Sequence, residues 1–584
     1  MIGTTKEKRT KTRKIVSFEL KSQRGKKNKN REFYNIIEFS YSKEGLKLLI
    51  IILTFIAFTG LVALISWYKT KEENLSTKEG YFLAGRGLTG LVIAGSLEMT
   101  NLSTEQLVGQ AGQSYSTNMG AMSWSVNASI ALLALALIFL PKYLKAGITT
   151  IPEFLEVRFD RTTKQIISFL FLLGYMLTYL PTVLYSGALA FNQIFHLDQL
   201  FGITTYQSIA ILCVAIGVIG SIYAIFGGLK AVAVSDTVNG VGLLIGGLLI
   251  GGLLIPILSI CILGNGSFLA GIQDFITNVP AEKFNAVNPA NALPPMIPWP
   301  VLFLGMLFNN LFYWCTNQSI IQRTLAAKNL AQAQRGAVFT AFLKLLDPFF
   351  ITICGLLAYR FFGDGLANSD LAYPSLITTV VPNWLLGIIA AVLFGAILSS
   401  FNSALNSCVT LYTLDFHRPL FNQTASDSHL VSVGKRVGTG LAIVSICVAP
   451  FVSNAPSGLY DFLQECFGFY SMPILAIVLV GFYTKRVPAC APKITLVVHV
   501  ILYSISKFLP LNVHYLYVLS VLFPVDLALM LLIGKFKPRA TDFILEDSKA
   551  VDLTPWKYVK PAALTCFILM LCVYALFSPI GLAR

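Results

Sequence analysis

Apolar stretches recur along the whole chain, separated by short polar segments. A helix needs roughly 17–25 mostly apolar residues to cross a bilayer. Fourteen stretches are candidate spans of about this length or longer, so we predict an all-α polytopic membrane protein. The predicted spans are 47–67, 88–112, 121–141, 165–193, 204–226, 236–262, 298–321, 337–360, 378–411, 433–452, 458–483, 494–508, 514–534 and 561–581.

Basic residues are concentrated in every second connecting segment. Twenty-five Lys and Arg residues lie in 68–87, 142–164, 227–235, 322–336, 412–437, 484–493 and 535–560. In the intervening segments, Lys283 and Arg360 are the clearest basic residues. Because basic loops stay on the cytoplasmic side, we expect the first set to be cytoplasmic. An even number of spans then places both termini, including the C-terminus, outside a plasma (inner) membrane.

The N-terminal tail holds most of the net charge. Residues 1–31 carry 12 Lys and Arg against Glu7 and Glu19, which is +10 of the chain's +15. Such a run is typical of a solvated or membrane-surface segment, so we expect a disordered tail and no nucleic-acid partner. Its predicted external position conflicts with its charge, although long segments translocate with less regard for charge.

Two predicted spans are interrupted by polar residues. Residues 98–109 read EMTNLSTEQLVG, and residues 305–323 read GMLFNNLFYWCTNQSIIQR, in which Asn309 and Asn310 break the apolar run. These are the second and seventh spans, so a five-span unit that is repeated once would be inverted in the membrane. Paired interrupted helices at matching positions mark the substrate site of many transporters. The alternative is a pair of kinks satisfied by neighbouring helices.

The repeat gives the predicted organisation of the chain. The segments are a basic tail (1–45), an extra span with its loop (46–87), a first repeat (88–262), an external loop (263–297), a second repeat (298–483) and three C-terminal spans (484–584).

Charged and hydroxyl side chains inside spans are further candidates for function. Glu105, Lys344 and Asp347 fall in apolar stretches, where a charge is costly and marks a solute or ion path unless it has a structural partner. Ser399 and Ser400 share one helix face with Ala396. Two hydroxyls beside a freed carbonyl suit a small hard cation, although small residues also line ordinary helix contacts in membranes.

Other classes of chemistry lack a signature in the sequence. The ten Cys and five His are scattered without metal or redox spacing. We find no nucleophile elbow and no acid–base cluster, so we expect a protein that is not an enzyme and has no organic cofactor.

Six motifs resemble the solute:sodium symporter family, and within it the bacterial sodium–galactose transporter branch. They are GYFLAGRGL (80–88), TNLSTEQLVG (100–109), TIPEFLEVRFD (150–160), SIYAIFGGLKAVAVSD (221–236), NQSIIQRTLAAKNLAQAQRG (317–336) and GAILSSFNSALNS (395–407). The resemblance extends over about 75–580. It implies the leucine-transporter-type fold of five plus five inverted helices, with one extra helix before and three after.

The resemblance also implies a set of site residues. A co-transported sodium ion would be bound by the carbonyls of Met99, Leu102 and Ala396 and the hydroxyls of Ser399 and Ser400. The solute contacts map onto Gln106, Asn310, Lys344 and Gln464, with an inner gate of Asn101 and Tyr313, and Asp236 matches an acidic residue on the ion path. From helix geometry, in which neighbouring residues point about 100° apart, we expect Glu105 to point away from the solute and to act as a structural brace.

The outer half of the solute site departs from the galactose branch. Trp124 and Ser125 replace a Tyr-Glu pair whose carboxylate grips sugar hydroxyls, and Tyr460 replaces a Phe. Amides still offer both donors and acceptors to a hydroxylated ring, and Trp124 or Tyr460 could stack on it. We therefore expect a sodium symporter for a small polar solute such as a sugar or polyol, with the lipid bilayer as its setting.

Three alternatives remain open at the level of sequence. Lys344 could grip the carboxylate of an organic anion or amino acid. A membrane enzyme would need a catalytic constellation, and a sensor that keeps the fold without transport usually carries a signalling domain.

Overall fold

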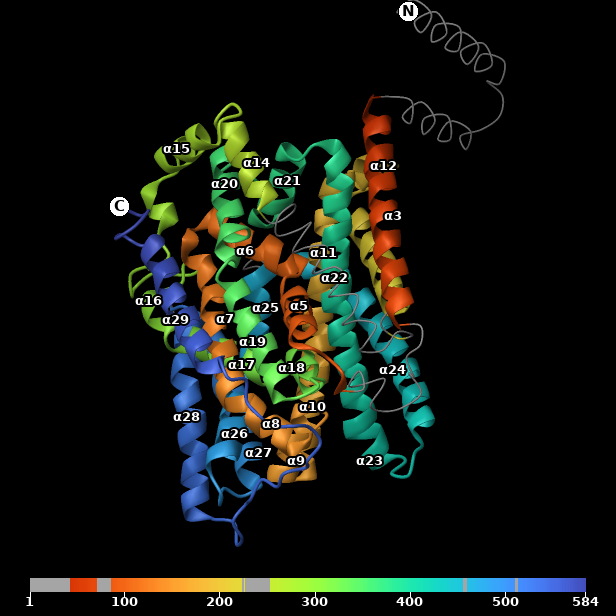
Figure 1. Ribbon diagram of the computed structural model, residues 1–584, viewed down its shortest axis with the longest axis vertical. Helices are drawn as coiled ribbons and strands as arrows, with labels where there is room; N and C mark the ends of the chain where they lie inside the picture. Colours follow the sequence, from red (N-terminus) through yellow and green to blue (C-terminus); the bar gives the residue numbers. More distant parts are fainter. Residues whose placement is uncertain (1–42, 71–85, 223–224, 226–252, 455–458, 510–512) are drawn as a thin grey trace, which may run out of the picture.

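The computed structural model describes residues 43–70, 86–222, 225, 253–454, 459–509 and 513–584. The basic tail, Asp236 and much of the predicted span 236–262 lie outside these residues. The regular secondary structure of the described part is helical apart from two isolated β-bridges. Its long helices run roughly side by side between two ends of the molecule (Figure 1).

The N-terminal half contains the following helices, in which η marks short 3-10 or π turns. They are α3 (Lys43–Thr70), α5 (Gly90–Asn101), α6 (Thr104–Ser116), η2 (Met119–Met122), α7 (Ser123–Ala134), η3 (Leu135–Phe139), α8 (Leu140–Ala146), α9 (Ile151–Arg158), α10 (Arg161–Gly174), η4 (Tyr175–Tyr179), α11 (Leu180–Phe195), α12 (Leu197–Phe201), a helix at Thr205–Ile222, α14 (Leu254–Leu263), α15 (Phe268–Asn278) and η6 (Ala281–Phe284).

The C-terminal half also consists of helices and short 3-10 or π turns. Its elements are α16 (Trp299–Leu302), α17 (Gly305–Cys315), α18 (Gln318–Leu325), α19 (Leu330–Lys344), η7 (Asp347–Phe349), α20 (Thr352–Phe362), η8 (Ser369–Leu371), α21 (Ala372–Val380), α22 (Asn383–Leu411), η9 (Tyr412–His417), α23 (Arg418–Leu420), α24 (Asp427–Val448), η10 (Ala449–Asn454), α25 (Leu459–Gly468), α26 (Ser471–Tyr483), α27 (Cys490–Phe508), α28 (Tyr515–Phe536) and α29 (Val559–Leu576).

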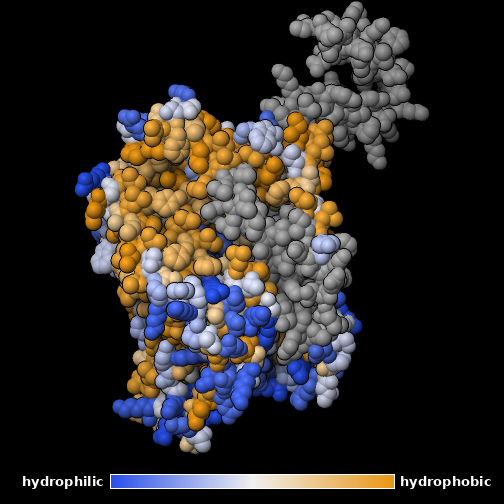
Figure 2. Space-filling model, viewed as in Figure 1, coloured by the Kyte–Doolittle hydropathy of each residue, from blue (hydrophilic) through white to orange (hydrophobic). Residues whose placement is uncertain are grey.

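These helices are suited to a bilayer. Within the described residues, nine are long and apolar enough to cross a membrane, or up to eleven if two bent pairs are each one span. Apolar side chains cover the upper and middle parts of one face, and hydrophilic side chains gather at its lower end (Figure 2). The protein is therefore an integral, multi-pass membrane protein.

Both predicted interruptions occur, but the second lies further along than expected. The first separates α5 from α6 at Leu102 and Ser103. The second separates α17 from α18 at Thr316 and Asn317. The expected break at Asn309 and Asn310 is wrong, because both residues are inside α17.

The extra helix α3 is closely packed on α22. A Cβ atom added at Gly387 would lie 2.0 Å from Thr54 Oγ1 and 2.2 Å from the carbonyl oxygen of Ile51. Only glycine allows the two helix backbones to approach this closely. α3 thus supports the side of α22 away from the interrupted helices.

Polar contacts connect several helices at the end of the molecule where α8 and α9 lie (lower end in Figure 1). Arg86 donates to the carbonyls of Leu325 (3.2 Å) and Gly147 (3.0 Å). Nearby, Lys164 Nζ lies 3.3 Å from Asp415 Oδ1, and Thr150 Oγ1 lies 3.2 Å from the same oxygen. These bonds join the loop before α5, the α8–α9 turn, α18, α10 and η9 at the end that carries the basic loops.

Candidate functional site

The break between α5 and α6 leaves backbone oxygens without their usual helical donors. The N–H of Ser103 donates to the carbonyl of Asn101 (2.9 Å) and therefore not to Met99 four residues back. The N–H of Gln106 donates to the carbonyl of Ser103 (3.1 Å), and not to Leu102. The carbonyls of Met99 and Leu102, which are both buried, are thus freed at the predicted position.

The serine face of α22 lies against this break. Ser400 Oγ donates to the carbonyl of Thr100 at 2.7 Å. Ser399 Oγ is buried and has no hydrogen-bond partner among the described residues, and Ala396 is 1% exposed one turn away. The structure therefore brings the hydroxyl of Ser400 to the end of α5. The carbonyl of Thr100 was not among the predicted ligands.

A small cavity lies on the other side of the same break. Its free volume is about 30 Å³, which is close to the share of one water molecule in the liquid. The lining combines amides, aromatic rings and one carboxyl group. It consists of Asn101, Glu105, Gln106, Trp124, Tyr179, Asn309, Asn310, Tyr313, Trp314, Tyr460, Leu463, Gln464 and Phe467.

A chain of hydrogen bonds runs behind the cavity from α6 to α25. Gln106 Nε2 donates to Ser125 Oγ (3.1 Å), and Ser125 Oγ donates to Gln110 Oε1 (3.2 Å). Gln110 Nε2 lies 3.4 Å from the hydroxyl of Tyr460. Ser125 is thus a support for Gln106 and is absent from the cavity lining.

Several polar atoms at the cavity are buried without a partner. In the described chain these include Gln106 Oε1, Asn309 Oδ1 and Trp124 Nε1. The amide nitrogen of Asn309 donates to Gln464 Oε1 at 2.8 Å, while Asn310 Nδ2 donates to the carbonyl of Met306. Buried polar groups are normally satisfied, so two acceptors and one donor are available to a ligand.

Aromatic rings complete the cavity. Trp124 and Tyr460 pack edge to face with ring centroids 5.4 Å apart. The two residues expected to form the inner gate are also in contact, because Asn101 Nδ2 lies 3.4 Å from the hydroxyl of Tyr313.

The structure does not bring Lys344 to this cavity. Its ammonium nitrogen lies 2.9 Å from Glu98 Oε1 and 2.8 Å from Asp347 Oδ2, and its side chain is fully buried. It is also 5.7 Å from the ring centroid of Trp314. A lysine with two carboxylate partners is neutralised, so the expected solute contact of Lys344 has no geometric support.

The lining differs from the sequence-based prediction at three residues. Glu105, which was expected to point elsewhere, lines the same cavity as Gln106 and accepts a hydrogen bond from Ser103 Oγ. Asn309 and Tyr179 were missed as lining residues. The adjacent Asn310 was the available signal for Asn309, whereas Tyr179 lies in an ordinary apolar stretch without any signal.

Metal-ligating clusters are absent from the part of the chain that the structure describes. No group of three or more His, Cys, Asp or Glu side chains is placed there to hold a metal ion. The contact between the first break and α22 is a candidate cation site among these residues. It offers neutral oxygens, which suit a monovalent ion.

Comparisons with known proteins agree with this geometry. The model of the "Sodium:solute symporter family" matches residues 81–490. The "Uncharacterized symporter YidK" of Escherichia coli (strain K12) is 46% identical over 533 residues, which is 91% of each chain. The "Sodium/glucose cotransporter" of Vibrio parahaemolyticus is 30% identical over 550 residues, or 90% of this chain and 98% of the other.

A solved structure shares the fold. It is the "Substrate-bound outward-open state of a Na+-coupled sialic acid symporter", with a TM-score of 0.71, 22% identity, and coverage of 85% of this chain and 98% of that chain. The family and these relatives are transporters and not enzymes, and sodium is the ion that couples to solute uptake. This chain therefore belongs to the sodium:solute symporter family.

Proposed function

We propose that the protein imports a small neutral polyhydroxylated solute, a sugar or a sugar-like polyol, together with sodium. The proposed solute class rests on one observation. Asn and Gln amides and aromatic rings line the cavity, while Lys344 lies outside the lining and is paired with two carboxylates. The relative named for glucose transport is consistent with this class.

The amide groups fit hydroxyls because each can both donate and accept. Gln106 Oε1 and Asn309 Oδ1 would accept from solute hydroxyls, and Trp124 Nε1 would donate to a ring or hydroxyl oxygen. Tyr460 and Trp124 would contact the apolar face of the solute ring. Asn101, Asn310, Tyr313 and Gln464 complete the proposed binding and gate residues.

The position of Lys344 argues against an organic anion or an amino acid. A solute carboxylate could bind it only by displacing Glu98 or Asp347. Removing one member of a buried ion pair costs roughly 3–5 kcal/mol. The remaining carboxyl group in the cavity, Glu105, would repel an anion further.

We place sodium between the first break and α22, with the carbonyls of Met99, Leu102 and Ala396 and the hydroxyls of Ser399 and Ser400 as ligands. The freed carbonyls and the unpartnered Ser399 hydroxyl support this. A bound ion would fix the end of α5 against α22 and so orient Asn101 and Gln106 for the solute. Sodium and solute binding would thus be coupled, because both would favour the same one of two conformational states.

The ion also brings the driving force. Its charge crossing the membrane is worth roughly 2.3 kcal/mol per 100 mV. At about 1.4 kcal/mol per tenfold change, this concentrates a neutral solute on the order of tens-fold.

For the topology, we propose fourteen spans with two inverted five-helix repeats, one helix before and three after them. The two interrupted pairs, α5–α6 and α17–α18, support the repeat. Hydrophilic side chains at the lower end, where the α8–α9 turn lies, support a cytoplasmic assignment for that end. The C-terminus would then be outside the plasma (inner) membrane, and Asp236 would lie on the cytoplasmic ion path.

A thermal-shift screen of the purified protein tests the solute class. Sugars, polyols and carboxylates are each added with sodium chloride or with potassium chloride. We expect stabilisation by a sugar or polyol that is larger in sodium, because ligands that bind only the folded state raise its stability. Stabilisation by carboxylates alone would overturn the neutral-solute proposal.

Flux in proteoliposomes with the stabilising compound then tests transport. Sodium-driven accumulation is expected. Binding without accumulation would instead favour the sensor alternative.

A further inference from the structure

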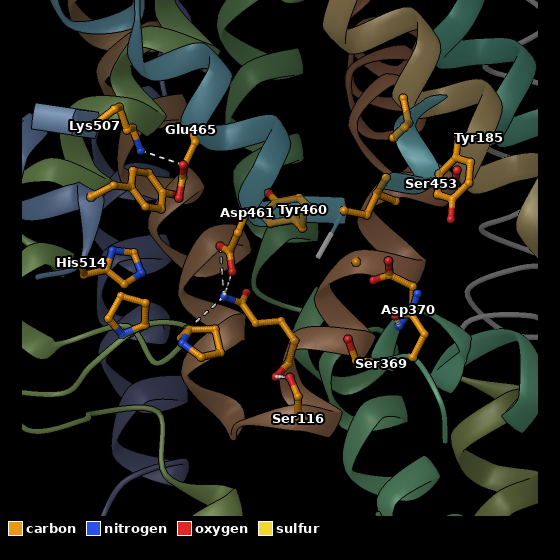
Figure 3. Close-up of a pocket in the computed structure, with 18 of the residues that line it drawn as sticks. Ser116, Tyr185, Ser369, Asp370, Ser453, Tyr460, Asp461, Glu465, Lys507 and His514 are labelled. Atoms are coloured by element: carbon orange, nitrogen blue, oxygen red, sulfur yellow. Dashed lines mark hydrogen bonds and ion pairs between the residues drawn. The ribbon is translucent and has the colours of Figure 1, made fainter. Parts of the chain in front are cut away.

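The helix α25 borders two cavities. Its residues Gln464 and Phe467 line the small solute cavity. Asp461 and Glu465 line a larger cavity, which has a free volume of about 860 Å³ (Figure 3). Tyr460 lines both of them. A displacement of α25 would therefore change the shape of the solute cavity.

The carbonyl groups at the end of α25 need donors, because the last four carbonyls of a helix have no partner within it. Two of them, at Cys466 and Phe467, accept from N–H groups three residues further along, at 3.4 and 3.1 Å. Such bonds tighten the last turn of the helix. The other two are the carbonyls of Glu465 and Gly468, which lie where the chain bends by 47° into α26.

Side chains of α27 supply both missing donors. The hydroxyl of Tyr503 donates to the carbonyl of Glu465 at 3.1 Å, and His499 Nε2 lies 3.0 Å from the carbonyl oxygen of Gly468. Lys507, also on α27, lies 2.6 Å from the carboxylate of Glu465 (Figure 3). A Cβ atom added at Gly468 would lie 2.4 Å from the Tyr503 hydroxyl oxygen, so glycine is needed for this close approach. α27 thus holds the end of α25 from outside the proposed repeats.

The orientation of the His499 ring depends on Asp526 of α28. A carbonyl oxygen can only accept, so Nε2 of His499 must carry a hydrogen. Nδ1 of the same ring lies 2.8 Å from Asp526 Oδ2. A proton must lie between these two atoms, on one or the other, because two lone pairs would otherwise meet. Both side chains are buried, at 0% and 1% exposure. Since the partner of one ring nitrogen determines the role of the other, Asp526 directs the Nε2–H group towards α25.

We propose that His499, oriented by Asp526, is a positioning residue for the solute site. Its bond to Gly468 fixes the end of α25, and Gln464 lies one helical turn before that glycine. Gln464 Oε1 accepts from Asn309 Nδ2 at 2.8 Å, so a shift of α25 would move both amides in the cavity. The inference rests on the proposed solute site. It does not involve the proposed sodium ligands on α5 and α22.

Hydrogen–deuterium exchange of the purified full chain, without solute, tests the bond to α25. All variants carry Asp526→Asn, which removes the buried carboxylate charge. In this background, His499→Gln keeps a donor near the position of Nε2, whereas His499→Asn keeps one near Nδ1 only. We expect exchange of the α25 amides to rise about tenfold with His499→Asn and to stay within about twofold of the background with His499→Gln. Exchange in α6 should be the same in all variants.

Equal exchange of α25 in the two double variants would overturn the proposal. Tyr503→Phe tests the same helix end with a smaller change, should the double variants fail to fold. It keeps the ring and removes only the donor to the carbonyl of Glu465. Exchange of α25 should then rise about threefold, and an unchanged rate would overturn the role of α27.

Binding of D-glucose and myo-inositol in sodium chloride tests the effect on the solute site. The variant with His499→Asn should bind the preferred compound about tenfold more weakly than the variant with His499→Gln. Sodium binding without solute should be equal in the two. Equal solute affinities would mean that His499 only stabilises α25, which overturns its positioning role. If the wild type binds neither compound, the proposed solute class fails, and the exchange rates alone decide whether His499 holds α25.

Discussion

The two interrupted helices have similar sequences at their breaks, but the breaks are bonded differently. At the break between α17 and α18, Asn317 Oδ1 accepts from the N–H (3.0 Å) and the hydroxyl (2.8 Å) of Ser319 and from the hydroxyl of Tyr175. At the break between α5 and α6, the Ser103 side chain makes no capping bond and donates to Glu105 instead. The start of α18 is thus capped by the side chain of Asn317, whereas the start of α6 has no side-chain cap.

The first break also depends on support from outside itself. Glu98, one turn before it, is bonded to Lys344 at the end of α19. A helix end that keeps free carbonyls needs such an anchor, because it lacks the bonds that would fix it locally. The two breaks thus differ in the capping of the helix that follows and in the support of the helix that precedes.

The largest expected effect comes from removing that anchor. Lys344→Gln leaves Glu98 and Asp347 as buried carboxylates without a cation, so we expect a loss of about 3–5 kcal/mol of stability. Thermal unfolding and folded yield measure it. Replacing Glu98, Lys344 and Asp347 together with apolar residues should restore most of the stability. If it does not, these side chains contribute to folding by more than cancelling each other's charge.

Removal of a proposed ligand at the first break should have a smaller and more specific effect. Ser400→Ala deletes one hydroxyl and the bond to the Thr100 carbonyl. We expect the sodium concentration for half-maximal binding to rise about tenfold, which corresponds to 1.4 kcal/mol. Titration with sodium in the absence of solute measures this, and Ser445→Ala, a buried serine on α24, is the matched control. Unchanged sodium dependence in both Ser400→Ala and Ser399→Ala would remove the sodium site from this break.

The solute side of the first break is tested by Gln106→Ala. Loss of one hydrogen bond to a polar solute costs about 0.5–1.5 kcal/mol, so we expect solute affinity to fall roughly two- to twelvefold. Sodium binding without solute should be nearly unchanged. Equal losses for both ligands would mean that Gln106 acts only by holding the break in shape.

The smallest effect on sodium and solute binding is expected from a change at the second break. Asn317→Ala removes the cap of α18 and should cost about 0.5–2 kcal/mol of stability. Thermal unfolding measures this loss, and the half-saturating concentrations of sodium and solute should stay as in the wild type. A selective loss of sodium binding here would show that the two breaks are equivalent and that the comparison is mistaken.

Much of this architecture could be predicted from sequence because it depends on local pattern. The interruption at 102–103 and the shared face of Ser399 and Ser400 follow from the order of residues along a helix. The second break was misplaced because Asn310 satisfies its amide within α17 by donating to the Met306 carbonyl. Adjacent amides therefore do not by themselves stop a helix.

The role of Lys344 could not be predicted in the same way. Glu98 lies 246 residues earlier in the chain, and only the packing of α5 against α19 brings the two together. Glu105 was misjudged for a related reason. Its expected direction assumed regular helical geometry at the start of α6, where the chain has just left an extended residue, Ser103.

The small size of the solute cavity affects how affinities of this protein should be interpreted. A space of about 30 Å³ must widen before a hexose-sized molecule can enter. A measured dissociation constant therefore combines contact energy with the work of opening, and the apparent affinity falls in proportion to the rarity of the open form. Each kcal/mol of opening work weakens binding roughly fivefold. Trimming Trp124 or Tyr460 could thus tighten binding even though it deletes contacts.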